Sequence, residues 1–251
     1  MTFPVYFHLA GYRIHPHPVL EVIAYTVGFQ MYRRIRRQFP AAAMPFETNL
    51  WILVGALFGA LAGSKLLAFV ESGPDFWAHR FEPGFWMGGK TILGGLLGGW
   101  LGVEIAKHFA GVKHSTGDAF VFPLITGMAI GRIGCFLTGL DDHTYGVATA
   151  LPWGVDFGDG IRRHPTQFYD IIFLGALALI FLAFRKKSSP NGRLFLLFVS
   201  SYCTWRFFVE FLKPTWKPIG ISPIQTAALC GLAVAVIKLS IKTGSIKTGR
   251  L

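Results

Sequence analysis

Seven stretches of mostly apolar residues alternate with shorter polar segments along this chain. They cover residues 19–32, 50–70, 91–106, 118–139, 168–184, 194–212 and 221–239. A helix crosses the roughly 30 Å of bilayer hydrocarbon with about 20 mostly apolar residues, because its backbone groups bond within the helix itself. The pattern therefore predicts an all-α polytopic membrane protein with seven transmembrane helices in one integral-membrane domain, residues 1–251. The first stretch is short and needs its flanking residues to complete a span.

The basic residues between the stretches predict the orientation of the chain. Fourteen Lys and Arg fall in connections on one side, and seven fall on the other. Basic residues are enriched on the cytoplasmic side, so the N-terminus is predicted outside and the C-terminus in the cytoplasm. The first 17 residues are too mixed in character for the apolar core of a signal peptide. The long connection 140–164 lies on the outer side, so the chemistry is expected there. We expect a multi-pass protein of a bacterial inner membrane.

Composition agrees with this prediction and excludes other classes. Hydrophobic residues make up 52% of the chain and charged residues only 15%, which is too apolar for one water-soluble globule. The net charge of +11 would suggest nucleic acid in a soluble protein, but here it follows the membrane topology, and no nucleic-acid partner is expected. Three cysteines lie in apolar stretches without CxxC or metal-ligand spacing. No disulfide framework, metal or cofactor is therefore predicted.

Two arginines lie inside apolar stretches, where an arginine costs at least about 2.5 kcal/mol on insertion scales. Arg206 and Glu210 are four residues apart, so they share a helix face and could simply pair. Arg132 has no acid within a turn of its own helix. Its compensating group is then either an acid from another helix or the phosphate of a ligand, which suits the planar two-donor guanidinium. These two residues are the first candidates for a phospholipid site.

Several other polar residues can be assigned either a structural role or a functional role. Glu21 is expected in the first turn of its helix, where the helix dipole favours an anion. His15 and His17 flank prolines and are too close together for helical metal geometry, which favours interfacial anchoring. His164 precedes Pro165, where it either caps the next helix or faces a lipid head group. Repeated glycines at 94–99 favour close helix packing over a ligand role.

Several segments together resemble the prolipoprotein diacylglyceryl transferase family over roughly residues 19–235. Residues 131–136, GRIGCF, followed by Gly139 and Gly146, resemble a family signature close to GRxGNFxNGExxG. Residues 163–170, RHPTQFYD, look like its RHPSQLYE segment, and residues 206–211, RFFVEF, look like its RxxVEFF segment. Residues 24–29 and the glycine pairs at 88–89 and 94–98 are also similar to family motifs. The resemblance implies seven spans with the N-terminus outside.

The resemblance implies transfer of a diacylglyceryl group from phosphatidylglycerol to a cysteine thiol of a lipoprotein precursor, with glycerol 1-phosphate released. The partners expected are therefore the membrane, this phospholipid and a lipoprotein precursor or other acceptor. The candidate catalytic residues are His164, Arg206, Glu210, Asp141 and His143. The candidate substrate-binding residues are Arg132, Gly131, Gly134, Cys135, Gly139, Gly146, Tyr25 and Gln167.

The chain also departs from the family pattern. Leu93 stands where the family has a histidine, Cys135 and Thr138 replace two asparagines, and Asp141 or Asp142 replaces the glutamate only with a small insertion. Two alternatives follow: a non-catalytic phospholipid-binding or lipid-moving paralogue, or a transferase with a different acceptor. Cys135 allows a covalent lipid intermediate, although a cysteine in an apolar helix is usually a small hydrophobe.

Overall fold

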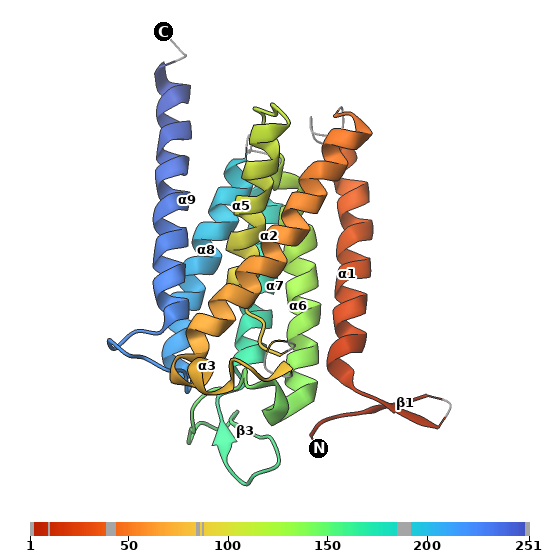
Figure 1. The fold of residues 1–251 in the computed structure, drawn as a ribbon, viewed down its shortest axis with the longest axis vertical. Helices are drawn as coiled ribbons and strands as arrows, with labels where there is room; N and C mark the ends of the chain where they lie inside the picture. The colour runs from red at the N-terminus through yellow and green to blue at the C-terminus, as the bar shows by residue number, and fades with distance from the viewer. Residues whose placement is uncertain are drawn as a thin grey trace. The chain divides into compact units, whose positions relative to one another are not determined.

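The computed structural model describes residues 3–9, 11–38, 44–83, 86, 88–184 and 192–248, with side chains up to residue 243. The fold in this part of the chain is mostly helical (Figure 1). Its long helices are α1 (Pro16–Ile35), α2 (Phe46–Ser72), α5 (Ile92–Phe109), α6 (Val121–Thr138), α7 (Thr166–Phe184), α8 (Arg193–Val209) and α9 (Pro223–Thr248). A short helix, α3 (Pro74–His79), follows α2. Each predicted stretch corresponds to one long helix.

The expectation of an all-α fold needs a correction, because the connections contain strands. A hairpin of β1 (Phe7–Leu9) and β2 (Tyr12–Ile14) precedes α1. A second two-stranded sheet pairs β3 (Val155–Asp156) with β4 (Arg162–Arg163) in the connection between α6 and α7. These strands are two or three residues long, too short for their alternation to show in the sequence.

Five helical segments in the described part of the chain are long and apolar enough to cross a membrane. They are Phe46–Ser72, Gly117–Asp142, Thr166–Ala183, Arg193–Leu212 and Pro223–Thr243. Large apolar side chains on these helices point outward, for example Leu57 and Ile172, each 68% exposed. Such a surface is stable in lipid rather than in water. The chain is therefore a polytopic membrane protein. Four of the basic residues used to predict its orientation, Arg185, Lys186, Lys187 and Arg250, lie outside the described residues.

The helices form two compact units, each described here by itself. Unit 1 comprises residues 1–39, 116–190 and 211–214, and contains α1, α6 and α7. In it, α1 packs along α6, with Tyr32 stacked on Phe120 at a ring-centroid distance of 4.3 Å. Unit 2 comprises residues 40–115, 191–210 and 215–251. Here α2 crosses α5 (Figure 1), and α9 packs on α8, α5 and α2.

Glycines bring α2 and α5 into backbone contact. Three antiparallel pairs face each other across the crossing: Gly55 with Gly102, Gly59 with Gly98, and Gly63 with Gly94. A Cβ atom on any of the six would lie within 3.0 Å of the partner helix. Small residues at this spacing let membrane helices approach until their backbones touch, which maximises dispersion contacts. The structure thus confirms the packing interpretation of the glycine repeat.

We expect Gly98→Ala to destabilise the protein by about 1–3 kcal/mol, because overpacking a close contact strains the surrounding backbone. The new Cβ would lie 2.8 Å from the Gly63 Cα atom. The matched control is Gly175→Ala on α7, where a Cβ would meet nothing within 4 Å. Thermal unfolding midpoints of the purified full chain in detergent measure both. A midpoint for Gly98→Ala equal to that of the control would contradict the packing described here.

Candidate functional site

Arg132 is buried on α6 and pairs with an acid from the next helix. Its Nε atom lies 2.7 Å from Oδ2 of Asp170 on α7, and both side chains are almost fully buried. Of the two alternatives considered for Arg132, an acid on another helix is the one present in the structure. A buried ion pair offsets the cost of taking either charge out of water, whereas either partner alone would be strongly destabilising. The pair therefore holds a guanidinium group inside an apolar unit.

Cys135 lies one helical turn after Arg132, on the same face of α6. Its sulfur is 3.9 Å from Arg132 Nη1. Gly134 lets α1 approach at this level, since a Cβ there would be 3.2 Å from the Leu20 side chain and 3.5 Å from the His17 Cα atom. The absence of a side chain at Gly134 thus positions His17, at the start of α1, beside Cys135. His17 lies in the first turn of α1, and His15 is the N-cap residue. The Nδ1 atom of His15 accepts a hydrogen bond from the His17 backbone N–H at 3.3 Å.

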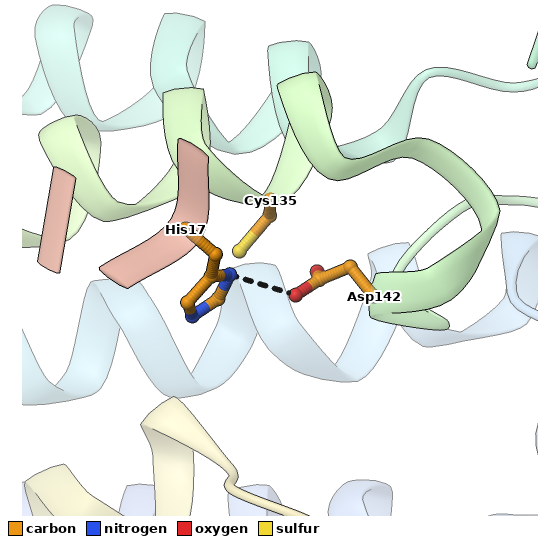
Figure 2. Close-up of side chains that lie close together, drawn as sticks. All are labelled: His17, Cys135 and Asp142. Carbon is orange, nitrogen blue, oxygen red and sulfur yellow. Dashed lines mark ion pairs between the residues drawn. The ribbon is translucent and has the colours of Figure 1, made fainter. Parts of the chain in front are cut away.

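Asp142 completes a group of three side chains with His17 and Cys135 (Figure 2). α6 ends at Thr138, and the next residue, Gly139, has a φ of +72° and packs against Phe3, so any side chain at this position would be strained and would clash. A single 3-10 turn, Gly139–Asp142, then returns the chain toward Cys135. Asp142 Oδ1 lies 3.0 Å from His17 Nδ1. The Cys135 sulfur lies within 4.8 Å of a side-chain atom of each neighbour, and Figure 2 shows all three side chains converging.

A second set of hydrogen bonds fixes the orientation of Asp142. Thr144 Oγ1 donates to Asp142 Oδ2 at 2.5 Å and accepts from Gln167 Nε2 at 3.2 Å. The Thr144 carbonyl accepts from Thr166 Oγ1 at 2.6 Å. Thr166 and Gln167 are fully buried at the start of α7. Gln167, a predicted substrate-binding residue, therefore supports Asp142 through Thr144.

His164 lies in the connection before α7 and contacts aromatic residues. Its Nδ1 is 3.1 Å from the Tyr169 hydroxyl, which accepts from Trp153 Nε1 at 2.8 Å. Gly146 packs directly against it: a Cβ on Gly146 would be 2.6 Å from the His164 Cβ. The Gly146 N–H also donates to the His164 carbonyl at 2.9 Å. Only glycine permits this close approach, which is a structural reason for its place in the motif.

An exposed ion pair lies in the same connection. Arg163 Nη1 is 2.6 Å from Asp159 Oδ1. Hydrogen bonding to the Arg163 guanidinium holds the pKa of Asp159 below its usual range. Because the Asp159 side chain is in contact with solvent, we assign this pair to the shape of the connection rather than to chemistry.

The remaining candidates of unit 1 lie at its surface or beside open space. Asp141 and His143 are exposed, on either side of the inward-facing Asp142. Tyr25 is 68% exposed on α1 and donates to Glu21 Oε1 at 2.9 Å. Glu21 was expected in the first turn; α1 begins at Pro16, so Glu21 lies in the second turn instead. A Cβ on Gly131, next to Arg132, would meet nothing within 4 Å.

Arg206 belongs to unit 2 and pairs with Glu210, the residue directly after α8. Its Nη2 is 2.6 Å from Glu210 Oε2, and both side chains are buried. The pairing considered from their four-residue spacing is therefore present. Leu93, which stands where the resemblance implies a histidine, is 1% exposed in the first turn of α5. A leucine buried in this way contributes packing and no proton transfer.

The sequence did not indicate the role of three residues of the site. Asp170 stood in a recognised motif without a role, and Asp142 was only an alternative to Asp141. His17 was interpreted as an interfacial anchor from its neighbouring prolines, and its partners come more than 100 residues later in the chain. One feature of the sequence pointed to this group. His17, Cys135 and Asp142 all lie near the ends of predicted helices or beside motif glycines, and all are on the predicted outer side.

Comparison with known proteins places these features in a family. Residues 4–242 match the family described as Prolipoprotein diacylglyceryl transferase. The chain is 32% identical over 220 residues to the phosphatidylglycerol–prolipoprotein diacylglyceryl transferase of Dehalococcoides mccartyi, covering 81% of this chain and 79% of the relative. It is 32% identical over 240 residues to the enzyme of that name from Cupriavidus necator, covering 88% and 84%.

The same name is given to a Geobacter sulfurreducens protein that is 28% identical over 261 residues, covering 96% of this chain and 97% of the relative. No solved structure matches the fold. The family match spans nearly the whole chain and includes every residue of the site described above. The chain belongs to the prolipoprotein diacylglyceryl transferase family.

Proposed function

We propose that this protein transfers the diacylglyceryl group of phosphatidylglycerol to the thiol of a lipoprotein-precursor cysteine, releasing glycerol 1-phosphate. One observation carries the assignment from the family to this chain. A buried guanidinium, Arg132, lies 3.9 Å from a cluster of His, Cys and Asp at one end of an apolar helix unit. A lipid phosphate and an attacking thiol need these two kinds of group next to each other.

The reaction is a displacement at a glycerol carbon. The thiolate sulfur forms a bond to the terminal glycerol carbon of the diacylglyceryl group, and the bond from that carbon to the phosphate oxygen breaks. The electron pair leaves on the phosphate, so negative charge develops there. Arg132 supplies donors for that charge, and preorganised donors in a water-poor site are worth more than in water. Asp170 is its positioning residue, because it contacts Nε and fixes the plane of the guanidinium.

The other predicted residues keep proposed roles. Arg206 is proposed as a catalytic residue of unit 2, with Glu210 setting the orientation of its guanidinium. His164 is the candidate base, with Tyr169 orienting its ring. Asp141 and His143 are exposed, which suits contact with an incoming peptide.

We also propose that α1 and α5 cross the membrane, which makes seven spans with the N-terminus outside and the C-terminus in the cytoplasm. Their neighbours support this: α1 packs along α6, and α5 makes backbone contact with α2, both of which are long apolar helices. The protein would then lie in a bacterial inner membrane with its site at the outer face.

A second candidate function rests on Leu93. A buried leucine where the family has a histidine favours a paralogue that binds or moves phospholipid without the transfer, or that uses another acceptor. Binding without a mass increase on the acceptor peptide would select this alternative.

Arg132→Lys is expected to reduce transfer about 10²-fold or more, since a lysine keeps the charge opposite Asp170 but loses the planar donors for phosphate. The assay incubates the purified protein with labelled phosphatidylglycerol and a peptide carrying a lipoprotein cysteine motif, and follows the peptide mass. Arg33→Lys, at an exposed position on α1, is the matched control and should keep full activity. Full activity in Arg132→Lys would refute the role proposed for Arg132.

If α1 and α5 cross the membrane, a reagent confined to the outer side should label a cysteine at one end of each helix and not at the other end. In a Cys230→Ser background, Tyr12→Cys and Lys90→Cys should react with a membrane-impermeant maleimide in intact spheroplasts. Arg33→Cys and Lys113→Cys should react only after lysis. Equal reactivity at both ends of either helix would exclude its crossing.

A further inference from the structure

The group of His17, Cys135 and Asp142 contains three residue types that bind transition metals. One ligand atom from each lies within 4.8 Å of the other two. In a tetrahedral zinc site with bonds of about 2.0–2.3 Å, ligand atoms are separated by about 3.3–3.8 Å. The observed spacing therefore needs only small side-chain shifts to close around an ion. The sequence did not predict a metal, because these ligands share no local spacing motif.

The surroundings of this group have the features of a metal site. Thr144 bonds one oxygen of Asp142 and leaves Oδ1 facing His17, and Gln167 holds Thr144 in place. Bonds of this kind to the ligands orient them and are typical of metal sites. Cys135 is buried, Asp142 is 10% exposed at its side chain, and His17 is 33% exposed. The group is thus enclosed on the cysteine side and open on the histidine side.

A set of three protein ligands with one open side is typical of catalytic rather than structural zinc, where all four positions are protein side chains. Thiolate, imidazole and carboxylate together favour zinc over magnesium or calcium, which prefer oxygen ligands only. The open position can take a fourth ligand from outside the protein.

We propose that His17, Cys135 and Asp142 bind a zinc ion whose open position takes the thiol of the acceptor cysteine. This inference rests on the proposed transferase function for the identity of the acceptor. A thiol that coordinates zinc loses its proton to solvent and stays a thiolate at neutral pH. The metal-bound sulfur then forms the bond to the glycerol carbon, and the carbon–oxygen bond to the phosphate breaks.

The position of Arg132 suits this chemistry. Its Nη1 lies 3.9 Å from the Cys135 sulfur, so a phosphate held by Arg132 would lie next to the metal-bound thiolate. Nucleophile and leaving group would be brought together on the same face of α6, one turn apart. The site also explains how the chain activates a thiol with Leu93 at the family's histidine position. In this arrangement Cys135 is a ligand and carries no lipid.

Metal content tests the site directly. The full chain, purified in detergent through an affinity tag that binds no metal and without chelators, should hold about one zinc per chain by elemental mass spectrometry. Cys135→Ser and Asp142→Asn keep the size and polarity of the cluster but remove strong ligands, so each should hold less than about a fifth of that amount. The control Cys230→Ala, at an exposed cysteine on α9, should hold as much zinc as the unaltered chain. Equal zinc in Cys135→Ser and the unaltered chain would overturn the site.

Cobalt substitution tests the open position without an activity readout. In the Co²⁺ protein, the sulfur-to-cobalt absorption should rise about twofold when a peptide with the acceptor cysteine is added, because a second thiolate joins the first. The same peptide with serine in place of cysteine should leave the spectrum unchanged. No response to the cysteine peptide would overturn the proposed role of the metal in binding the acceptor.

The transfer assay separates this inference from the function it rests on. A zinc-free chain that still modifies the peptide would overturn the zinc site and leave the transferase function intact. Zinc held by the three ligands, without any transfer to the peptide, would overturn the transferase function and leave the metal site standing. A diacylglyceryl adduct on Cys135 itself would overturn its role as a ligand.

Discussion

The ion pair between Arg132 and Asp170 is the interaction on which unit 1 depends. Both side chains are buried between α6 and α7, in a unit whose outer face is apolar. An isolated charge in that setting would be strongly unfavourable, so neither residue is tolerated without the other. The pair joins the two helices and holds a buried cation, the group proposed above to bind the lipid phosphate.

Glycine positions determine how closely the other elements approach. Gly134 admits the first turn of α1 against α6, and Gly146 admits the backbone of His164. Gly139 ends α6 with a positive φ, and the turn after it carries Asp142 back toward Cys135. The family motif is thus a set of backbone conformations and close contacts as much as a set of reactive groups. The contacts at these glycines bring an acid, a thiol and an imidazole together, although none of the three is a neighbour of another in sequence.

This chain departs from the pattern of its family at two positions where the resemblance implies polar side chains. Leu93 is packed where the resemblance implies a histidine, and Cys135 stands where it implies an asparagine. The buried arginine and its helix remain. A cysteine beside His17 and Asp142 converts a polar position into a set of metal-binding groups. Under the proposals above, the acceptor thiol would be activated in a different way while Arg132 would still hold the lipid phosphate.

The sequence alone determined the helices, because the spacing of apolar residues reflects a local rule: about 20 apolar residues span the hydrocarbon. It also identified Arg132 and Arg206 as costly charges, and the four-residue spacing of Arg206 and Glu210 made their pairing visible. The partner of Arg132 was not visible, since Asp170 lies on the next helix and could be one of several acids. Neither was the cluster of His17, Cys135 and Asp142, which depends on a glycine contact between α1 and α6 and on a turn after Gly139. Local spacing determines which helix a residue belongs to, whereas only the packing of helices decides which distant side chains meet.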